Sequence, residues 1–146
     1  MIDKKQYASL VKKASPNSKK LKNGFWAFVF GGMICTIGQL FKELYEFWGF
    51  KEDVIKMAVP STLIVIAALL TGFKIFDNIA KVAGAGTLVP ITGFSNAVTA
   101  PAVEFKNEGF ILGVGAKMFT IAGPVIVYGT VASVVYGVVY WITTLF

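Results

Sequence analysis

The sequence predicts an all-α integral membrane protein with a few transmembrane helices and further helical segments that are broken by glycine and proline. Three observations predict this fold class. Apolar residues make up 55% of the 146 residues, and charged residues make up only 15%. Several uncharged runs are long enough to cross a bilayer. Glycine and proline cluster in other apolar runs. A water-soluble chain of this size needs more charge to cover its surface.

The first element is a basic arm over residues 1–23. It holds seven of the fourteen lysines, opposed only by Asp3, whereas the rest of the chain is neutral. Lysines before a hydrophobic span are typical of a cytoplasmic N-terminus. Because the chain has no arginine, we expect no nucleic-acid partner. Apolar residues recur in the arm at helical spacing, which predicts an amphipathic helix on lipid headgroups or a dock for a partner: Tyr7, Leu10, Val11 and Ala14.

The membrane domain is predicted over residues 24–146, and its first span over 24–41. Eighteen residues reach ~27 Å as a helix, which is enough to cross. Trp26 and Trp48 suit the two interfaces, and Gly49 is expected to end the helix.

The charged stretch 42–56 then predicts a turn on the far side of the membrane. A second span follows over 57–73, with Pro60 in its first turns, where a missing N–H costs least. A third uncharged run predicts the last span over 125–146.

Between the second and last spans lie two segments predicted to be broken and re-entrant, about 82–103 and 109–123. The first is apolar enough to enter the membrane, but breakers interrupt it. Irregular backbone at membrane depth is tolerated only where protein covers it or it lines a wet cavity, so this stretch indicates a binding or permeation site. Pro124 is expected to end the second segment. The breakers of the first are Gly84, Gly86, Pro90, Gly93 and Pro101.

A weak inverted repeat is a further expectation, because Gly72-Phe73 and Gly109-Phe110 each precede similar small-residue patterns. The chain has no histidine and one cysteine, Cys35, so histidine-based catalysis, a Cys/His pair and an internal disulfide are excluded. We therefore predict a protein that is not an enzyme and that has no catalytic residue, metal site or cofactor.

Several motifs resemble the stage V sporulation protein A membrane family over most of residues 24–135. The most specific is the AGAG-x-x-VP-x-TGF core, which begins at Ala83. Thr71 and the basic arm favour one membrane subunit of this family over a sibling with similar segments. Lys74 departs from the pattern, since a small residue such as glycine is expected there. The matching stretches include FGGMICTIGQ from Phe30, ALLTGF from Ala68 and EGFILGVG from Glu108.

The resemblance implies a channel or transport complex in the spore inner membrane. It implies movement of dipicolinic acid, usually with calcium, during sporulation and germination, and gating by membrane tension. It also implies other membrane subunits of the family and a soluble dipicolinate-binding subunit as partners. The alternative is a scaffold that recruits the soluble partner through residues 1–23 and does not itself conduct.

If the solute is a small planar dianion, N-termini of half-helices inside the membrane suit its carboxylates. Breaks are expected at 84–87 and 93–96. Lys117 is the most internal cation, and it either lines the path, snorkels to the interface or pairs with a carboxylate. Path candidates are Gly84, Gly86, Thr87, Thr92, Gly93, Ser95, Asn96 and Lys117.

Three carboxylates are candidates for a mouth of the path or for subunit contacts. Glu104 and Glu108 are expected one helical turn apart on one face, where they bind calcium or subunits or simply remain solvated. Asp77 is expected to pair with Lys81 at i+4.

Overall fold

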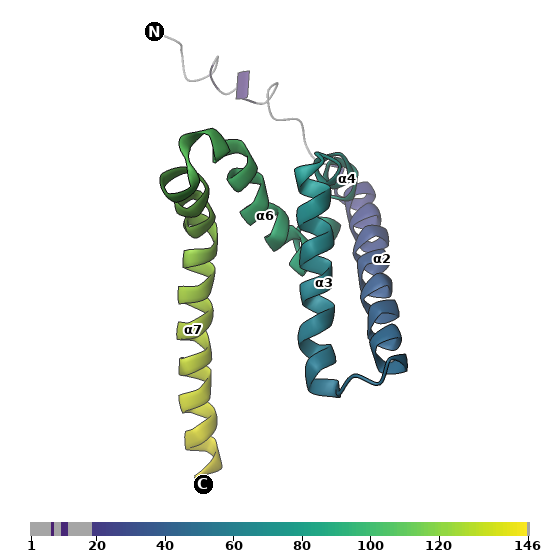
Figure 1. Cartoon of the computed structure of the whole chain (residues 1–146), viewed down its shortest axis with the longest axis vertical. Coiled ribbons are helices and arrows are strands. Elements are labelled where there is room, and N and C mark those ends of the chain that lie inside the picture. The colour runs from purple at the N-terminus through teal and green to yellow at the C-terminus, as the bar shows by residue number, and fades with distance from the viewer. Residues whose placement is uncertain (1–6, 8–9, 12–18, 146) are drawn as a thin grey trace.

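A computed structural model describes residues 7, 10–11 and 19–145, and each secondary-structure element in these ranges is a helix (Figure 1). The all-α prediction is thereby confirmed. Of the basic arm, Tyr7, Leu10 and Val11 are helical and exposed. The remainder of the predicted amphipathic helix lies outside the described residues. Three helical stretches are long and apolar enough to cross a membrane, namely Lys20–Phe47, Glu52–Gly72 and Phe110–Thr144.

Helices α2 (Lys20–Phe47) and α3 (Glu52–Gly72) form an antiparallel hairpin (Figure 1). Gly49 has a φ of 79°, and the amide of Phe50 donates to the carbonyl of Tyr45 at 3.1 Å. This left-handed closure confirms that Gly49 ends the first helix. The Tyr45 hydroxyl also lies 2.6 Å from the Thr62 hydroxyl across the hairpin.

The connection between α2 and α3 covers residues 48–51 and is much shorter than the predicted turn over 42–56. Except for Lys51, the charged residues of this stretch lie within the two helices, where the i,i+4 pairs Lys42–Glu46 and Lys56–Glu52 add a few tenths of a kcal/mol each. Since α3 begins at Glu52, Pro60 lies in its third turn, and its expected place in the first turns is wrong.

Helices α4 (Phe76–Ala83), α5 (Ala85–Leu88) and α6 (Ile91–Glu104) form a re-entrant hairpin. The chain turns back after α3, and α6 starts beside the middle of α3 and returns to the end at which α4 began (Figure 1). The hydroxyl of Ser95 donates to the carbonyl of Ile64, in the middle of α3, at 2.8 Å. The tip of the re-entrant hairpin is therefore fixed at mid-depth of the α2–α3 hairpin.

A 3-10 turn (Phe105–Glu108) and a π-helical turn (Phe110–Gly115) lead into α7 (Ala116–Thr144). The predicted division of this region into a segment 109–123 and a span 125–146 is wrong, because α7 continues through Pro124. From Pro124 to Thr144 every residue of α7 is exposed. A break there would expose unpaired backbone that nothing in the described chain covers, so the helix persists.

The weak inverted repeat is also not reproduced. After Gly72-Phe73 the chain forms α4 and breaks at Gly84, whereas after Gly109-Phe110 it forms a π-turn and then an unbroken helix through Gly123. The two copies therefore adopt different structures.

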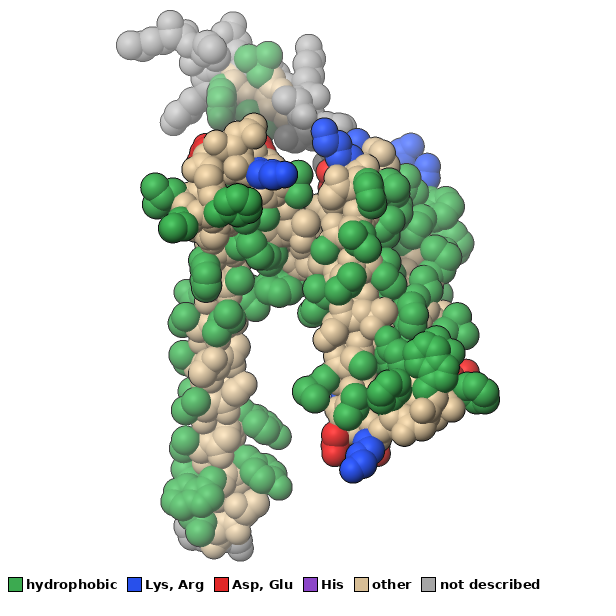
Figure 2. Space-filling view, in the orientation of Figure 1, with side chains coloured by type: hydrophobic (Ala, Val, Ile, Leu, Met, Phe, Trp, Pro, Cys, Tyr) green, Lys and Arg blue, Asp and Glu red, His purple; other side chains and the backbone are tan. Residues whose placement is uncertain are grey.

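Charged side chains of the described residues gather at two ends of the molecule (Figure 2). The end that holds the start of α2 and both ends of the re-entrant hairpin carries seven lysines and three carboxylates. The end that holds residues 42–56 carries three lysines and four carboxylates. The first set comprises Lys19, Lys20, Lys22, Lys74, Lys81, Lys106, Lys117, Asp77, Glu104 and Glu108.

Candidate functional site

The first predicted break, at 84–87, is present in the re-entrant hairpin. Gly84 separates α4 from α5 with a φ of 53° and a ψ of −124°. This backbone conformation is open to glycine and strained for other residues. Gly84 therefore lets the chain change direction between two short helices.

The second break lies at Val89 and Pro90 and not at 93–96 as expected. Pro90 precedes α6 in an extended conformation with a ψ of 171°. Because it stands before the first turn of the helix, its missing N–H removes no hydrogen bond of α6. Gly93 is helical, and a Cβ there would overlap the backbone of Leu88. Glycine at position 93 therefore allows α6 to lie close to the backbone of Leu88, and it does not break the helix.

Gly86 brings α5 into direct contact with α2. A Cβ at Gly86 would overlap the backbone of Ala27, and Gly31 faces the Gly86 carbonyl from the next turn. Small residues on both helices allow this approach, as at close helix crossings in membranes. The re-entrant hairpin is therefore locked to α2 by backbone contact.

Hydroxyl groups predicted to line a path are buried at the tip of the re-entrant hairpin. Thr87, Thr92 and Ser95 are 2%, 7% and 4% exposed. Each hydroxyl donates to a backbone carbonyl: Thr87 to Gly84, Thr92 to Thr87 and Ser95 to Ile64. The three hydroxyls lie near the hairpin tip, and in this conformation they stabilise the hairpin and offer no free donor.

Asn96 joins α6 to α3 through Thr71, whose hydroxyl lies 2.9 Å from the Asn96 amide oxygen and 2.7 Å from the carbonyl of Ala67. A hydroxyl has one proton and can donate to only one of these acceptors. Rotating the Asn96 amide by 180° lets its NH₂ donate to Thr71 while Thr71 donates to Ala67. Thr71, singled out only by the family resemblance, is thus a structural partner of the candidate site.

An apolar cavity of about 190 Å³ lies between the α2–α3 hairpin and the re-entrant hairpin. Its walls include Phe30, Ala67 and Phe76, and its polar side chains are Thr87 and Thr92. Since both hydroxyls donate their protons to backbone carbonyls, the cavity offers no free hydrogen-bond donor to an anion. Water is a poor occupant because it would find few polar partners there.

Lys117 lies away from these residues, at the opposite end of α6. Its ammonium group sits 4.0 Å from the ring centroid of Phe105, which follows α6 directly. This is a cation–π contact. Among the described residues Lys117 forms no ion pair with Asp77, Glu104 or Glu108. The structure therefore separates Lys117 from the other path candidates.

The three candidate carboxylates are exposed at the same end of the molecule. The expected ion pair between Asp77 and Lys81 is not formed, since Lys81 donates to the Asn78 amide oxygen at 3.3 Å. The single helical face expected for Glu104 and Glu108 is also wrong, because the chain changes from α to 3-10 between them. Within the described ranges no three acidic, cysteine or histidine residues are grouped as metal ligands.

Sequence reasoning did not identify a cationic cleft between the start of α2 and the end of α4. It is lined by Lys19, Lys22, Asn23, Trp26, Lys81 and Val82, and has a volume of about 440 Å³. In the sequence, Lys19 and Lys22 belong to the basic arm, and Lys81 is predicted to pair with Asp77. Only the packing of α4 against α2 brings them together, and no local sequence pattern encodes that packing.

Comparisons with known proteins identify a family of membrane proteins. The family model described as SpoVAC/SpoVAEB sporulation membrane protein matches residues 23–139. The chain is similar to Stage V sporulation protein AC of Bacillus subtilis (strain 168), with 45% identity over 137 residues that cover 93% of this chain and 91% of the relative. No solved structure matches the chain significantly.

Proposed function

The chain belongs to the SpoVAC/SpoVAEB family of sporulation membrane proteins, and on this premise we propose that it is a non-enzymatic membrane subunit of a complex that moves dipicolinic acid across the spore inner membrane during sporulation and germination. The observation that carries the proposal is the re-entrant hairpin. It is broken at Gly84 and Pro90, and its tip reaches the middle of α3. Interrupted helices at mid-depth are the usual structural setting of solute sites in transport proteins.

We propose the calcium chelate as the transported form. Dipicolinate has two carboxylates, so a one-to-one chelate with Ca²⁺ carries no net charge. A neutral solute crosses an apolar region at a much smaller electrostatic cost than a dianion does. The apolar cavity beside Thr87 and Thr92 supports this form, because it contains no group that could balance a free dianion.

The path is proposed to form within a hetero-oligomer. The hydroxyls of Thr87, Thr92 and Ser95 are already bound to backbone carbonyls. In addition, every residue of α7 from Pro124 to Thr144 is exposed, which leaves the whole circumference of this helix open to other subunits. Other membrane subunits of the family and a soluble dipicolinate-binding subunit are the proposed partners. Gating by tension, which the resemblance implies, requires the re-entrant hairpin to move apart from α2, since tension favours a larger area in the membrane plane.

The test is dipicolinate release from liposomes that contain the chain with its family subunits. Gly86→Ala places a Cβ against the backbone of Ala27, and overpacking of this kind costs about 1–3 kcal/mol. Because this overlap is relieved when the re-entrant hairpin moves apart from α2, we expect release without applied tension to rise about tenfold or more, the factor that corresponds to about 1.4 kcal/mol. Gly129→Ala on α7 is the matched control, because a Cβ there meets nothing within 4 Å.

Normal release from an assembled Gly86→Ala complex would contradict a path at the re-entrant hairpin and favour the scaffold. Deleting residues 1–23 further distinguishes a conducting subunit from a scaffold. Loss of recruitment of the soluble partner, with release intact, would support the scaffold. Release from liposomes that contain this chain alone supports a pore.

A further inference from the structure

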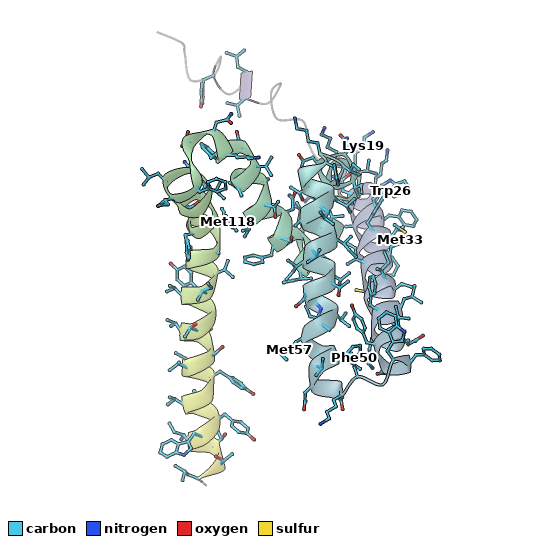
Figure 3. All side chains as sticks on the ribbon, viewed as in Figure 1. Lys19, Trp26, Met33, Phe50, Met57 and Met118 are labelled. Carbon is cyan, nitrogen blue, oxygen red and sulfur yellow. The ribbon has the colours of Figure 1, made fainter. Side chains whose placement is uncertain are left out.

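The cationic cleft carries an inference that is independent of the transported solute. Lys19, Lys22 and Trp26 reach it from the start of α2, and Lys81 reaches it from the last turn of α4. Figure 3 shows Lys19 and Trp26 at the end of α2 that lies beside α4. A second hollow of about 300 Å³ shares Lys81 with the cleft and extends to Gly84. The cleft thus adjoins the first break of the re-entrant hairpin.

Among the residues that the structure describes, the charged side chains that line the cleft have a single sign. They comprise three lysines, beside one amide and one indole, and no described carboxylate lines the cleft. Lys81 contacts the neutral side chain of Asn78, and the two ion pairs within the described ranges, Lys42–Glu46 and Lys56–Glu52, lie at the other end of the molecule. Like charges that converge without a counter-ion repel one another, so an anion in the cleft would relieve this repulsion.

The position along α2 indicates which anion reaches the cleft. Lys22 is the last charged residue before an uncharged stretch that continues to Phe41, and Trp26 is half-buried one turn further along. Tryptophan next to lysine marks the headgroup level of a membrane helix. Basic pockets between helices on the cytoplasmic side are typical binding sites for anionic lipid headgroups.

We propose that the cationic cleft binds the phosphate headgroup of an anionic phospholipid and that this lipid clamps α4 to α2. The Lys81 ammonium is the central ligand, because it is the lysine of the cleft that lies on the re-entrant hairpin. Gly84, where the chain turns into α5, follows Lys81 by less than one helical turn. A bound lipid would therefore hold the first break of the hairpin in place against α2.

The test uses the full chain in nanodiscs of phosphatidylcholine with increasing phosphatidylglycerol. In the wild type, phosphatidylglycerol is expected to raise the midpoint of thermal unfolding and to remain bound in native mass spectrometry. Lys81→Gln should reduce the amount of retained phosphatidylglycerol by at least about threefold. This fold-change corresponds to only a modest part of the free energy of a charge-assisted contact. Lys81→Arg should retain the lipid. Lys106→Gln is the matched control, because Lys106 is exposed at the same end and outside the cleft.

Equal retention in Lys81→Gln and Lys106→Gln would overturn the proposal, because the lipid would then respond only to overall charge. A second arm distinguishes a soluble anion from a lipid. Dipicolinate or inorganic phosphate is added to nanodiscs of pure phosphatidylcholine. Stabilisation by a soluble anion that depends on Lys81, without any effect of phosphatidylglycerol, would also overturn it. Neither readout involves solute release, so failure here leaves the proposed function untouched.

Discussion

Lys74 adopts a left-handed backbone conformation that its residue type does not predict. It follows α3 with a φ of 60°, its amide donates to the carbonyl of Thr71, and the amide of Ile75 donates to the carbonyl of Leu70, both at 2.9 Å. This is the closure that glycine usually provides at a helix end. The small residue expected at position 74 thus has a conformational reason and no packing role. Gly49 could be predicted as a helix end because it is glycine, whereas lysine carries no such signal.

Lys74→Gly is expected to stabilise the protein by about 0.5–1 kcal/mol. A side chain in the left-handed region costs about 1–2 kcal/mol, and the greater freedom of glycine in the unfolded chain offsets part of the gain. The free energy of unfolding of the two proteins in bicelles measures the difference. Lys74→Ala is the control, since it removes the charge and keeps the Cβ. Equal stability of the glycine and alanine variants would show that the backbone is not strained there.

At the scale of elements, breakers in the sequence predicted that the 82–103 stretch is interrupted, but not where. Gly84 and Pro90 interrupt it, whereas Gly93 and Pro101 lie within α6. A break frees backbone groups that must be covered at membrane depth. Between the two breaks α5 packs against α2, and after them α6 packs against α3, whereas Leu88 and Val89 at the hairpin tip remain exposed. Tertiary packing, which local composition does not encode, therefore decides which glycine and proline residues interrupt a helix.

Pro124 shows the opposite outcome, because α7 continues through it without cover from other helices. The proline has no N–H, so the carbonyl of Thr120 lacks its helical donor. Pro124→Ala should restore this hydrogen bond and stabilise the helix by up to about 3 kcal/mol. Amide hydrogen exchange in nanodiscs should slow by about tenfold or more around residues 120–128, since tenfold corresponds to about 1.4 kcal/mol. Val125→Ala is the control. Faster exchange in Pro124→Ala would indicate that the proline shapes a contact of α7.

For the whole molecule, composition sufficed to predict a helical membrane protein, and the clustering of charge sufficed to predict that residues 19–22 and 42–56 lie at charged ends of it. The site was only partly predictable. Thr87, Thr92 and Ser95 are buried near the hairpin tip, whereas the apolar cavity and the cationic cleft join residues that are distant in sequence. Lys117 lies in an apolar stretch of the sequence, and the structure places its ammonium group over the ring of Phe105.

Three candidate spans and one re-entrant hairpin predict that the two ends of the described chain lie on opposite sides of the membrane (Figure 1). The excess of lysine at the start of α2 predicts that this end is cytoplasmic. Single cysteines in a Cys35→Ser background test both statements with an impermeant thiol reagent. Asn107→Cys should react only from the cytoplasmic side, and Lys51→Cys and Leu145→Cys only from the other.

Val89→Cys tests the depth of the re-entrant hairpin. Val89 is 82% exposed in the chain and lies between α5 and α6 at the hairpin tip, and α6 starts beside the middle of α3 (Figure 1). If the tip faces lipid or a neighbouring subunit at mid-depth, the impermeant reagent should not reach it from either side, because a thiol in hydrocarbon is both inaccessible and protonated. Tyr136→Cys, exposed on α7 within the last span, is the control for an unreactive lipid-facing position. Labelling of Val89→Cys from the cytoplasmic side would instead indicate a water-filled entrance, and labelling from the far side would show that the hairpin crosses the membrane completely.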